Sequence, residues 1–179
     1  MKLESKRVYS GRVIDLDVDS VRFPNGSTGQ LEMIRHPGAA AVVPFASDPH
    51  GPDPTILLIH QYRYATDGSL FEIPAGRLNP GEDPRVCAER ELLEEVGVKA
   101  GRVERLTTIW TTPGFTDEKI HLFWATDLTA GQHAREADEF IEVTPKPLSE
   151  ALQLIRSGVI SDAKTALALL FVAGFILEH

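Results

Sequence analysis

The sequence predicts an α+β fold in which a mixed β-sheet lies between helices. Three observations support this prediction. Continuous apolar runs at 39–45 and 55–59 are typical of strands that are covered on both faces. Residues 83–96 carry the start and stop signals of a helix. The expected strands and helices do not alternate regularly, as they would in a doubly wound parallel sheet.

The N-terminal region is expected to form antiparallel strands. Apolar and polar residues alternate over 12–23, and Pro24-Asn25-Gly26 indicates a turn into a second strand at 30–35. The two apolar runs that follow are separated by 47–54. That segment is rich in proline, aspartate and glycine, which is typical of a loop.

The clearest helix of the sequence covers 83–96. Asp83 is a residue type that caps helices, Pro84 occupies the favoured first position, and Gly97 ends the helix. Its buried face is expected to consist of residues four positions apart, which are Ala88, Leu92 and Val96.

The remainder of the chain is expected to contain further strands and two helices. The strands lie at 103–109, 119–126 and 141–143, the first two on either side of a Thr-Thr-Pro-Gly turn. The helices cover 148–157 and 161–177. The last helix is expected to bury a stripe formed by Leu167, Leu170 and Phe171.

The composition excludes several classes of protein. The chain has 179 residues, of which 42% are hydrophobic and 25% charged, as in an ordinary soluble protein with one compact domain. Its net charge of −8 at pH 7 argues against a nucleic-acid binder, which needs a basic face. No apolar stretch reaches the roughly 18 residues that span a bilayer, and no signal peptide is recognisable. Because Cys87 is the one cysteine, no internal disulfide is expected, and a cytoplasmic location follows.

Three carboxylates crowd one turn of the predicted helix. Glu91, Glu94 and Glu95 stand at positions i, i+3 and i+4, where like charges repel each other. A hard divalent cation turns this repulsion into attraction, because Mg²⁺ prefers carboxylate oxygens, waters and phosphates as ligands. A solvated acidic face is the alternative interpretation of the same spacing.

The segment 76–98 resembles the Nudix box, which specifies Gly, five residues, Glu, seven residues and then Arg-Glu-apolar-x-Glu-Glu-x-Gly-apolar. The matching residues are Gly76, Glu82, Arg90, Glu91, Leu92, Glu94, Glu95, Gly97 and Val98. The resemblance implies a Nudix fold, an α/β/α sandwich. It also implies that Glu91 and Glu95 bind metal, with Glu94 as a third ligand or a base. An ion pair of Glu82 with Arg90 is expected to be structural, like Gly76 and Gly97.

Residues outside the box resemble the ADP-ribose pyrophosphatase branch of this family. Phe71-Glu72-Ile73-Pro74-Ala75-Gly76 is similar to its Glu-x-Pro-Ala-Gly motif, in which the carbonyl at the Ala75 position is a further metal ligand. Gln61-Tyr62-Arg63 also matches, and an arginine there suits a bidentate grip on phosphate. A surface arginine at the end of a strand is the alternative. The resemblance further implies substrate contacts by Glu72, Pro113 and Gly114.

Two more segments resemble this branch. In the first, 32–38, Glu32 and Arg35 are expected near the adenine or ribose. In relatives the N-terminal strands exchange with a second subunit, and the resemblance therefore implies a homodimer. It also divides the chain into an N-terminal strand segment, residues 1–38, and a Nudix domain, residues 39–179. The second segment, 135–143, is similar to a loop with a metal-binding or catalytic glutamate. Glu139 best matches the ligand, and Glu136 is the other candidate for the base.

The resemblance implies hydrolysis of the diphosphate bond of a nucleoside diphosphate sugar. ADP-ribose is the expected substrate, giving AMP and ribose 5-phosphate with two or three Mg²⁺ ions, which Mn²⁺ can replace. GDP-mannose or another nucleotide sugar is the nearest alternative. An alternative of another class is a non-catalytic Nudix module that senses a ligand. Neither a nucleic-acid nor a membrane partner is expected.

Overall fold

A computed structural model describes residues 1–132 and 140–177 of the chain. The chain forms two compact units. The N-terminal unit consists of Met1–Gly38 and Thr108–Ile120, and the main unit of Ala39–Thr107 and His121–His179. None of the helices in the described part of the chain has the length and apolar character that a membrane crossing requires.

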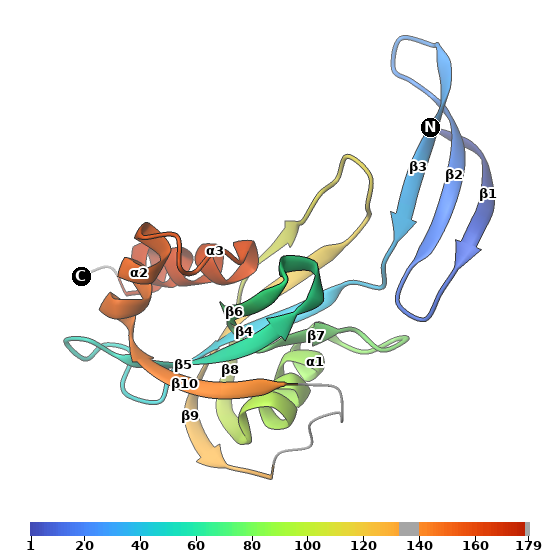
Figure 1. The fold of residues 1–179 in the computed structure, drawn as a ribbon. Coiled ribbons are helices and arrows are strands. Elements are labelled where there is room, and N and C mark those ends of the chain that lie inside the picture. The colour runs from blue at the N-terminus through green and yellow to red at the C-terminus, as the bar shows by residue number, and fades with distance from the viewer. Residues whose placement is uncertain (133–139, 178–179) are drawn as a thin grey trace. The chain divides into compact units, whose positions relative to one another are not determined.

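The N-terminal unit contains an antiparallel sheet in the order β1-β2-β3 (Figure 1). Its strands are β1 (Lys2–Ser10), β2 (Asp15–Arg22) and β3 (Thr28–Arg35). The two strands predicted from the alternation are confirmed, and so is the turn between them, where Gly26 has a φ of 88°. Strand β1 was not predicted, since all of its residues are exposed and show no buried face.

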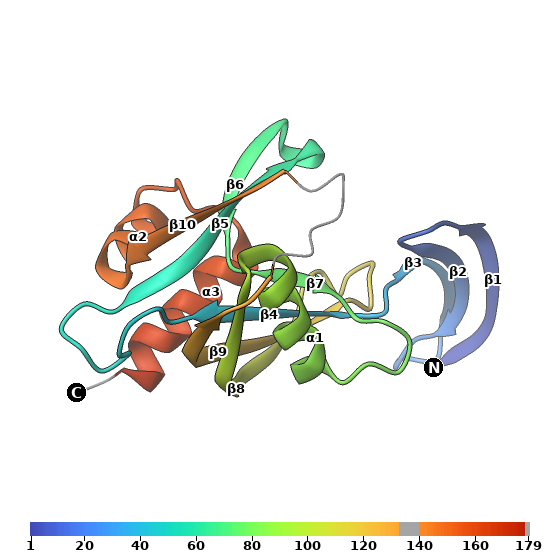
Figure 2. The same ribbon diagram turned by 90° about the horizontal axis from the view of Figure 1, so that it is seen from below.

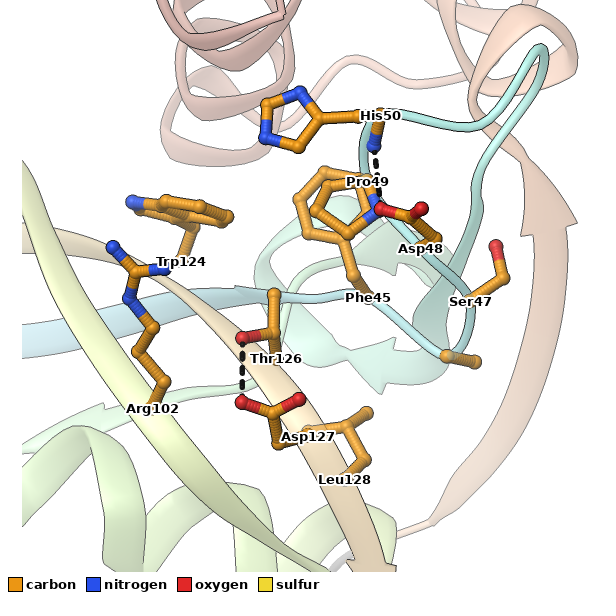
Figure 3. Close-up of a pocket in the computed structure, with 11 residues that line it drawn as sticks. Phe45, Ser47, Asp48, Pro49, His50, Arg102, Trp124, Thr126, Asp127 and Leu128 are labelled. Carbon is orange, nitrogen blue, oxygen red and sulfur yellow. Dashed lines mark hydrogen bonds between the residues drawn. The ribbon is translucent and has the colours of Figure 1, made fainter.

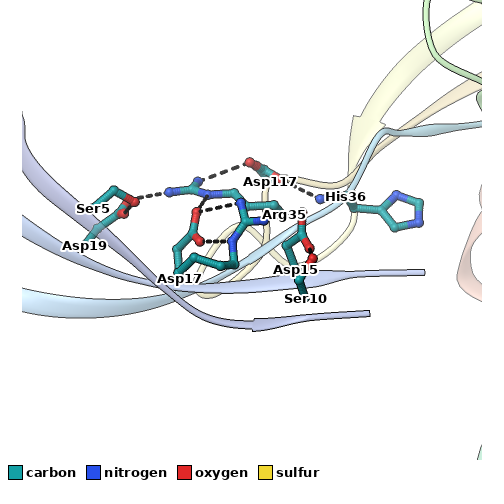
Figure 4. Close-up of polar contacts among 9 residues, drawn as sticks. Ser5, Ser10, Asp15, Asp17, Asp19, Arg35, His36 and Asp117 are labelled. Carbon is teal, nitrogen blue, oxygen red and sulfur yellow. Dashed lines mark hydrogen bonds and ion pairs between the residues drawn. The ribbon is translucent and has the colours of Figure 1, made fainter. Parts of the chain in front are cut away.

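Charged residues line one face of strand β2. Asp17 and Asp19 are only 6% and 5% exposed, although they alternate with the apolar residues of β2. The guanidinium of Arg35 contacts both carboxylates and also donates to Asp117 at 3.1 Å (Figure 4). A hydrogen bond from Arg7 is the main reason that the pKa of Asp17 lies below its usual value. The buried face of β2 is therefore an ion-pair network.

The main unit contains two sheets, in the orders β10-β5-β6 and β7-β4-β9-β8 (Figures 1 and 2). β8 and β9 continue into residues 108–120 of the N-terminal unit. The predicted strands are confirmed; β4 ends one residue earlier than expected, the others are longer, and the short β6 and β7 were not predicted. The strands are β4 (Ala39–Pro44), β5 (Thr55–Arg63), β6 (Gly68–Glu72), β7 (Ala75–Arg77), β8 (Val98–Trp110), β9 (Lys119–Ala130) and β10 (Ile141–Pro147).

The predicted helix at 83–96 is confirmed, with one difference in its winding. Asp83 caps it by accepting the N–H of Arg85 at 2.9 Å, and Gly97 ends it with a φ of 76°. The first part, α1 (Pro84–Glu91), is α-helical, but η2 (Leu92–Val96) is a π-helical turn. Short π-helical segments inside helices are frequent at functional sites. The winding therefore changes at the carboxylates that the sequence singles out.

The C-terminal helices are also confirmed, but the buried stripe predicted for the last one is wrong. They are α2 (Leu148–Arg156) and α3 (Ala163–Phe171), and α3 continues into the π-turn η3 (Val172–Ile176). Leu167 and Leu170 are 39% and 52% exposed. Phe171 is half-buried and contacts Phe175. The buried residues of this helix are Thr165, Ala168, Leu169 and Val172.

Helices cover both faces of strand β4 (Figure 2). On one face, α1 packs in a cluster that includes Val42 and Phe123. On the other face, next to α3, the alternate residues Ala41 and Val43 are also fully buried. On α3, Ala168 and Leu169 are fully buried, whereas Leu167 and Leu170 are exposed. The α+β architecture with a sheet between helices is confirmed.

Candidate functional site

Two of the three predicted acidic residues are buried. Glu91 is 7% exposed and Glu95 only 2%, while Glu94 is half-buried. Burial of an ionised carboxylate is unfavourable unless charges or hydrogen bonds compensate for it. For Glu95, the N–H of Ala75 donates to Oε2 at 3.0 Å. The acidic turn therefore faces the backbone of strand β7 rather than solvent.

Gly76 brings this backbone into direct contact with the acidic turn. A Cβ atom at Gly76 would lie 1.8 Å from Oε1 of Glu91, so no other residue fits here without displacing that carboxylate. Two buried carboxylates and an adjoining strand backbone form an oxygen-rich cradle, which fits the ligand preference of Mg²⁺. Within the described residues, no three His, Cys, Asp or Glu side chains converge into a complete metal site by themselves.

Arg90 is the cation that balances this turn. It donates to Glu82 through Nε at 2.9 Å and Nη2 at 3.0 Å, so the expected ion pair is confirmed. Its Nη1 also donates to Glu91 at 2.6 Å and to Glu94 at 3.0 Å. Cys87 lies beside this cluster and is fully buried. Burial is the main cause that raises the pKa of the Cys87 thiol to about 12, which agrees with a packing role.

The ion pair of Glu82 with Arg90 is expected to make stability depend on acidic pH. The hydrogen bond from Arg90 is the main cause that lowers the pKa of Glu82 from 4.5 to about 2. A group with a lowered folded-state pKa stabilises the fold above its unfolded-state pKa, and this contribution is lost as the pH falls toward the folded-state value. Thermal unfolding from pH 7 to pH 2 is expected to show a melting temperature that falls less steeply for Glu82→Gln than for the wild type.

The control for this measurement is Glu89→Gln, which removes an exposed carboxylate that pairs with Arg85 on the same helix. Exposed pairs of this kind contribute little to stability. The control is therefore expected to follow the wild-type curve. Parallel curves for the wild type and Glu82→Gln would contradict the assigned role of Glu82.

Arg63 lies at the end of β5 and is paired with Glu72 at the end of β6. Its Nε and Nη2 donate to the two carboxylate oxygens at 2.7 and 2.9 Å. Glu72 is buried, whereas the side chain of Arg63 is 40% exposed. The fork with Glu72 uses one edge of the guanidinium and leaves Nη1 for another anion. Nearby, the negative charge of Glu95 contributes to raising the pKa of Arg63, after the hydrogen bond to Glu72.

Comparison with known proteins identifies the family of this chain. The NUDIX domain profile matches residues 35–167 of this chain. The chain belongs to the Nudix family. This match contains Gly76 and the whole acidic turn, and the predicted Nudix box is thereby confirmed as part of a Nudix domain.

Several relatives of this Nudix chain carry a functional name. It is 42% identical over 172 residues to a methanol dehydrogenase activator of Bacillus methanolicus, covering 95% of this chain and 90% of that one. It is 39% identical to an ADP-ribose pyrophosphatase of Bacillus subtilis with the same coverage. A GDP-mannose pyrophosphatase of Cronobacter sakazakii is 42% identical over 125 residues, or 64% of each chain.

A solved structure supports the fold independently. The crystal structure of an ADP compounds hydrolase superimposes with a TM-score of 0.83 and covers 98% of this chain and 93% of that one. The two sequences are 23% identical, so this likeness concerns the fold. The expected Nudix fold is confirmed.

Four further predicted site residues of this Nudix chain lie in the N-terminal unit. Glu32 is exposed on β3, and Arg35 lies in the ion-pair network of the N-terminal unit. Pro113 and Gly114 form a turn of the same unit, in which the N–H of Phe115 donates to the carbonyl of Thr112 at 3.2 Å. Their contacts with substrate stay predictions. Glu136 and Glu139 lie outside the described residues.

A cavity of about 510 Å³ in the main unit contains none of the predicted site residues (Figure 3). Trp124 on its wall is only 7% exposed, because Arg102 lies over its ring at 5.7 Å and Phe45 packs edge-on at 6.0 Å. Its ring is therefore not free to stack on a nucleobase. Asp48 is engaged by the N–H of His50 at 3.0 Å.

Sequence reasoning missed one charged neighbour of the site. Lys164 of α3 contacts the carboxylate of Glu72 through Nζ. The two residues are 92 positions apart, so no local pattern connects them. A lysine in the first turn of a helix is normally interpreted as solvent-exposed, but the side chain of Lys164 is only 12% exposed.

Proposed function

We propose that this Nudix chain hydrolyses the diphosphate bond of nucleoside diphosphate sugars, with ADP-ribose cut to AMP and ribose 5-phosphate. The observation that carries the proposal is the burial of Glu91 and Glu95 against the backbone at Ala75 and Gly76. Such a cradle suits a divalent cation. The relative named ADP-ribose pyrophosphatase in Bacillus subtilis supports the choice of substrate.

In this proposal, Glu91, Glu95 and the carbonyl of Ala75 would hold two or three Mg²⁺ ions, or Mn²⁺ in their place. When bound, the cations supply positive charge to the phosphate oxygens and polarise the attacking water. Glu94 either completes the set of ligands or accepts the proton of that water. Glu139 and Glu136 are the other candidates for ligand and base. The water oxygen bonds to one phosphorus while the bridging oxygen leaves with the other phosphate.

Arg63 is proposed to bind the diphosphate through the guanidinium edge that Glu72 leaves open. Glu72 acts on the substrate by fixing this arginine. Arg35, Glu32, Pro113 and Gly114 are proposed to contact the nucleotide or the sugar. We further propose that the chain acts in the cytoplasm as a homodimer that exchanges its N-terminal strands. This assignment is consistent with exposed apolar residues of the N-terminal unit, among them Leu3, Val8, Tyr9 and Leu31.

A release assay tests the proposed activity. Purified protein with Mg²⁺ is incubated with ADP-ribose, ADP-glucose, GDP-mannose, NADH and diadenosine polyphosphates, and the products are separated by chromatography. The highest kcat/KM is expected for ADP-ribose. A higher value for GDP-mannose would favour the alternative supported by the GDP-mannose pyrophosphatase relatives. No turnover of any substrate would leave the non-catalytic module as the better proposal.

Replacement of Arg63 is expected to weaken substrate binding. In Arg63→Ala the phosphate loses a charge-assisted hydrogen bond, and KM for ADP-ribose is expected to rise about tenfold with a smaller change in kcat. Steady-state kinetics measures both constants. The matched control is Arg102→Ala, which removes another carboxylate-paired arginine of the main unit. A KM unchanged in Arg63→Ala would remove Arg63 from the binding site.

Replacement of Gly76 is expected to impair turnover more than stability. In Gly76→Ala the added Cβ must displace the Glu91 carboxylate, because Oε1 of Glu91 lies 1.8 Å from the ideal Cβ position at residue 76. A displacement of about 1 Å in a catalytic group lowers rates by about 10²-fold, and we expect a loss of this size in kcat. The control Gly174→Ala places its Cβ in open space. An unchanged kcat in Gly76→Ala would contradict the proposed cradle.

A further inference from the structure

Two cations hold the carboxylate of Glu72. Besides the two hydrogen bonds from Arg63, Nζ of Lys164 contacts Oε2. Burial raises the pKa of Glu72, but the hydrogen bond from Arg63 and the charge of Lys164 outweigh it, so that this pKa lies below its usual value. Glu72 is therefore an ionised group inside the protein, and it needs positive charge around it.

Lys164 is the more enclosed of the two cations. Its side chain is 12% exposed, against 40% for Arg63. Its Nζ also donates to Asp162 at 3.0 Å, and Asp162 in turn caps α3 by accepting the N–H of Thr165 at 3.0 Å. Lys164 is thus held between two carboxylates at the first turn of a helix. It cannot turn toward solvent without leaving Glu72.

The charges around Glu72 determine whether Arg63 can bind a phosphate. If Arg63 alone balanced the buried Glu72, its positive charge would be needed for that pair, and a phosphate would compete with Glu72 for it. Lys164 compensates Glu72 from the interior. The charge of Asp162, at the N-terminus of α3, is already favoured by the helix dipole and by the hydrogen bonds of its capping role. The exposed guanidinium of Arg63 is then available to an external anion.

The same helical turn also fixes the chain between Glu72 and the acidic turn. The N–H of Ile73 donates to the buried Oγ1 of Thr165 at 2.9 Å. Two residues further on, the N–H of Ala75 donates to Glu95. The first turn of α3 therefore anchors the strand segment that carries the proposed carbonyl ligand at one end and the partner of Arg63 at the other.

We propose that Lys164 is a positioning residue for the substrate diphosphate, acting through Glu72 on the orientation and the available charge of Arg63. This inference rests on the proposed function, because it assigns Arg63 to a phosphate. Lys164 itself touches no substrate atom. Its loss is expected to weaken binding of ADP-ribose and to leave the chemical step nearly unchanged.

Kinetics of Lys164→Met, which keeps an unbranched side chain one atom shorter and removes its charge, test this role. KM for ADP-ribose and its Kd from calorimetry are expected to rise about fivefold to tenfold, with kcat within about twofold of the wild type. Lys164→Arg is expected to restore both constants, because a guanidinium can again pair with Glu72. The control is Lys146→Met, which removes another largely buried, carboxylate-paired lysine of the main unit.

A double-mutant cycle with Glu72→Gln distinguishes positioning from a purely structural role. If Lys164 acts through Glu72, Lys164→Met adds no further rise in KM to that of Glu72→Gln, so the two effects do not multiply. The double variant contains no unpaired buried carboxylate, and it serves the test even if Lys164→Met alone does not fold.

An unchanged KM in Lys164→Met, effects that multiply in the double variant, or a loss confined to melting temperature and kcat would each overturn the inference. Wild-type protein that neither binds nor hydrolyses ADP-ribose would contradict this inference and the proposed function together. An active wild type with multiplying effects would contradict only the role of Lys164.

Discussion

Removal of divalent cations is expected to abolish hydrolysis of ADP-ribose, and added Mg²⁺ is expected to restore it. The chain carries a net charge of −8, and the buried carboxylates of Glu91 and Glu95 repel an anionic diphosphate. Arg90 is the nearest cation to the acidic turn, but it is engaged by Glu82, Glu91 and Glu94. The substrate can approach these carboxylates when a cation lies between the two sets of negative charges.

The measurement is product release after dialysis against EDTA, followed by titration with Mg²⁺. EDTA already saturated with Mg²⁺ is the control, because it contains the same chelator without free binding capacity. The circular dichroism spectrum is expected to stay the same throughout, because the ion pairs of Arg90 hold the acidic turn without a metal. Hydrolysis that persists after exhaustive dialysis would contradict the proposed chemistry.

The features that the sequence predicted correctly are those encoded within a few residues. Asp83, Pro84 and Gly97 mark the ends of the helix that carries the acidic turn, through backbone geometry that each residue favours by itself. The ion pair of Glu82 with Arg90 belongs to the same short segment. The apolar run at 39–45 predicted strand β4 because a strand buried on both faces needs no alternation.

The features that could not be predicted depend on contacts between distant residues. The buried face of α3 contains Thr165, Ala168 and Leu169, whereas Leu167 and Leu170 are exposed, and this choice depends on how the helix packs against the sheet. Likewise, hydropathy alone places Asp17 on the surface, but its partner Arg35 comes from the neighbouring strand β3. The π-turn at Leu92–Val96 leaves no mark in the spacing of the glutamates.

The candidate site also combines features that could be predicted from the sequence with contacts that could not. The acidic turn could be recognised from the box, but the contact of Gly76 with Glu91 required the position of β7. Arg63 could be chosen as a phosphate ligand, whereas its fork with Glu72 and the contact of Lys164 with Glu72 could not. These contacts join β5, β6 and α3, and the last of them spans 92 positions of the sequence.

Neutralising a buried carboxylate of the acidic turn is expected to remove catalysis and to leave the fold intact. In Glu95→Gln, kcat is expected to fall by about 10³-fold, because a neutral amide is a poor ligand for Mg²⁺ and no longer balances its charge. The amide oxygen can still accept the N–H of Ala75. Removing one of two neighbouring negative charges also relieves repulsion, so the melting temperature without metal is expected to stay the same or rise. Glu91→Gln is expected to behave in the same way.

Metal-dependent stability separates loss of the metal site from loss of the fold. Mg²⁺ that binds the folded state raises the melting temperature of the wild type by mass action, and Glu95→Gln is expected to show a much smaller rise. The control Glu89→Gln removes the same charge from an exposed position on the same helix, and it is expected to retain both the rise and the activity. Wild-type turnover in Glu95→Gln would remove this residue from the site. A variant that loses turnover but keeps the full response to Mg²⁺ would show that Glu95 acts on the reaction without holding the cation.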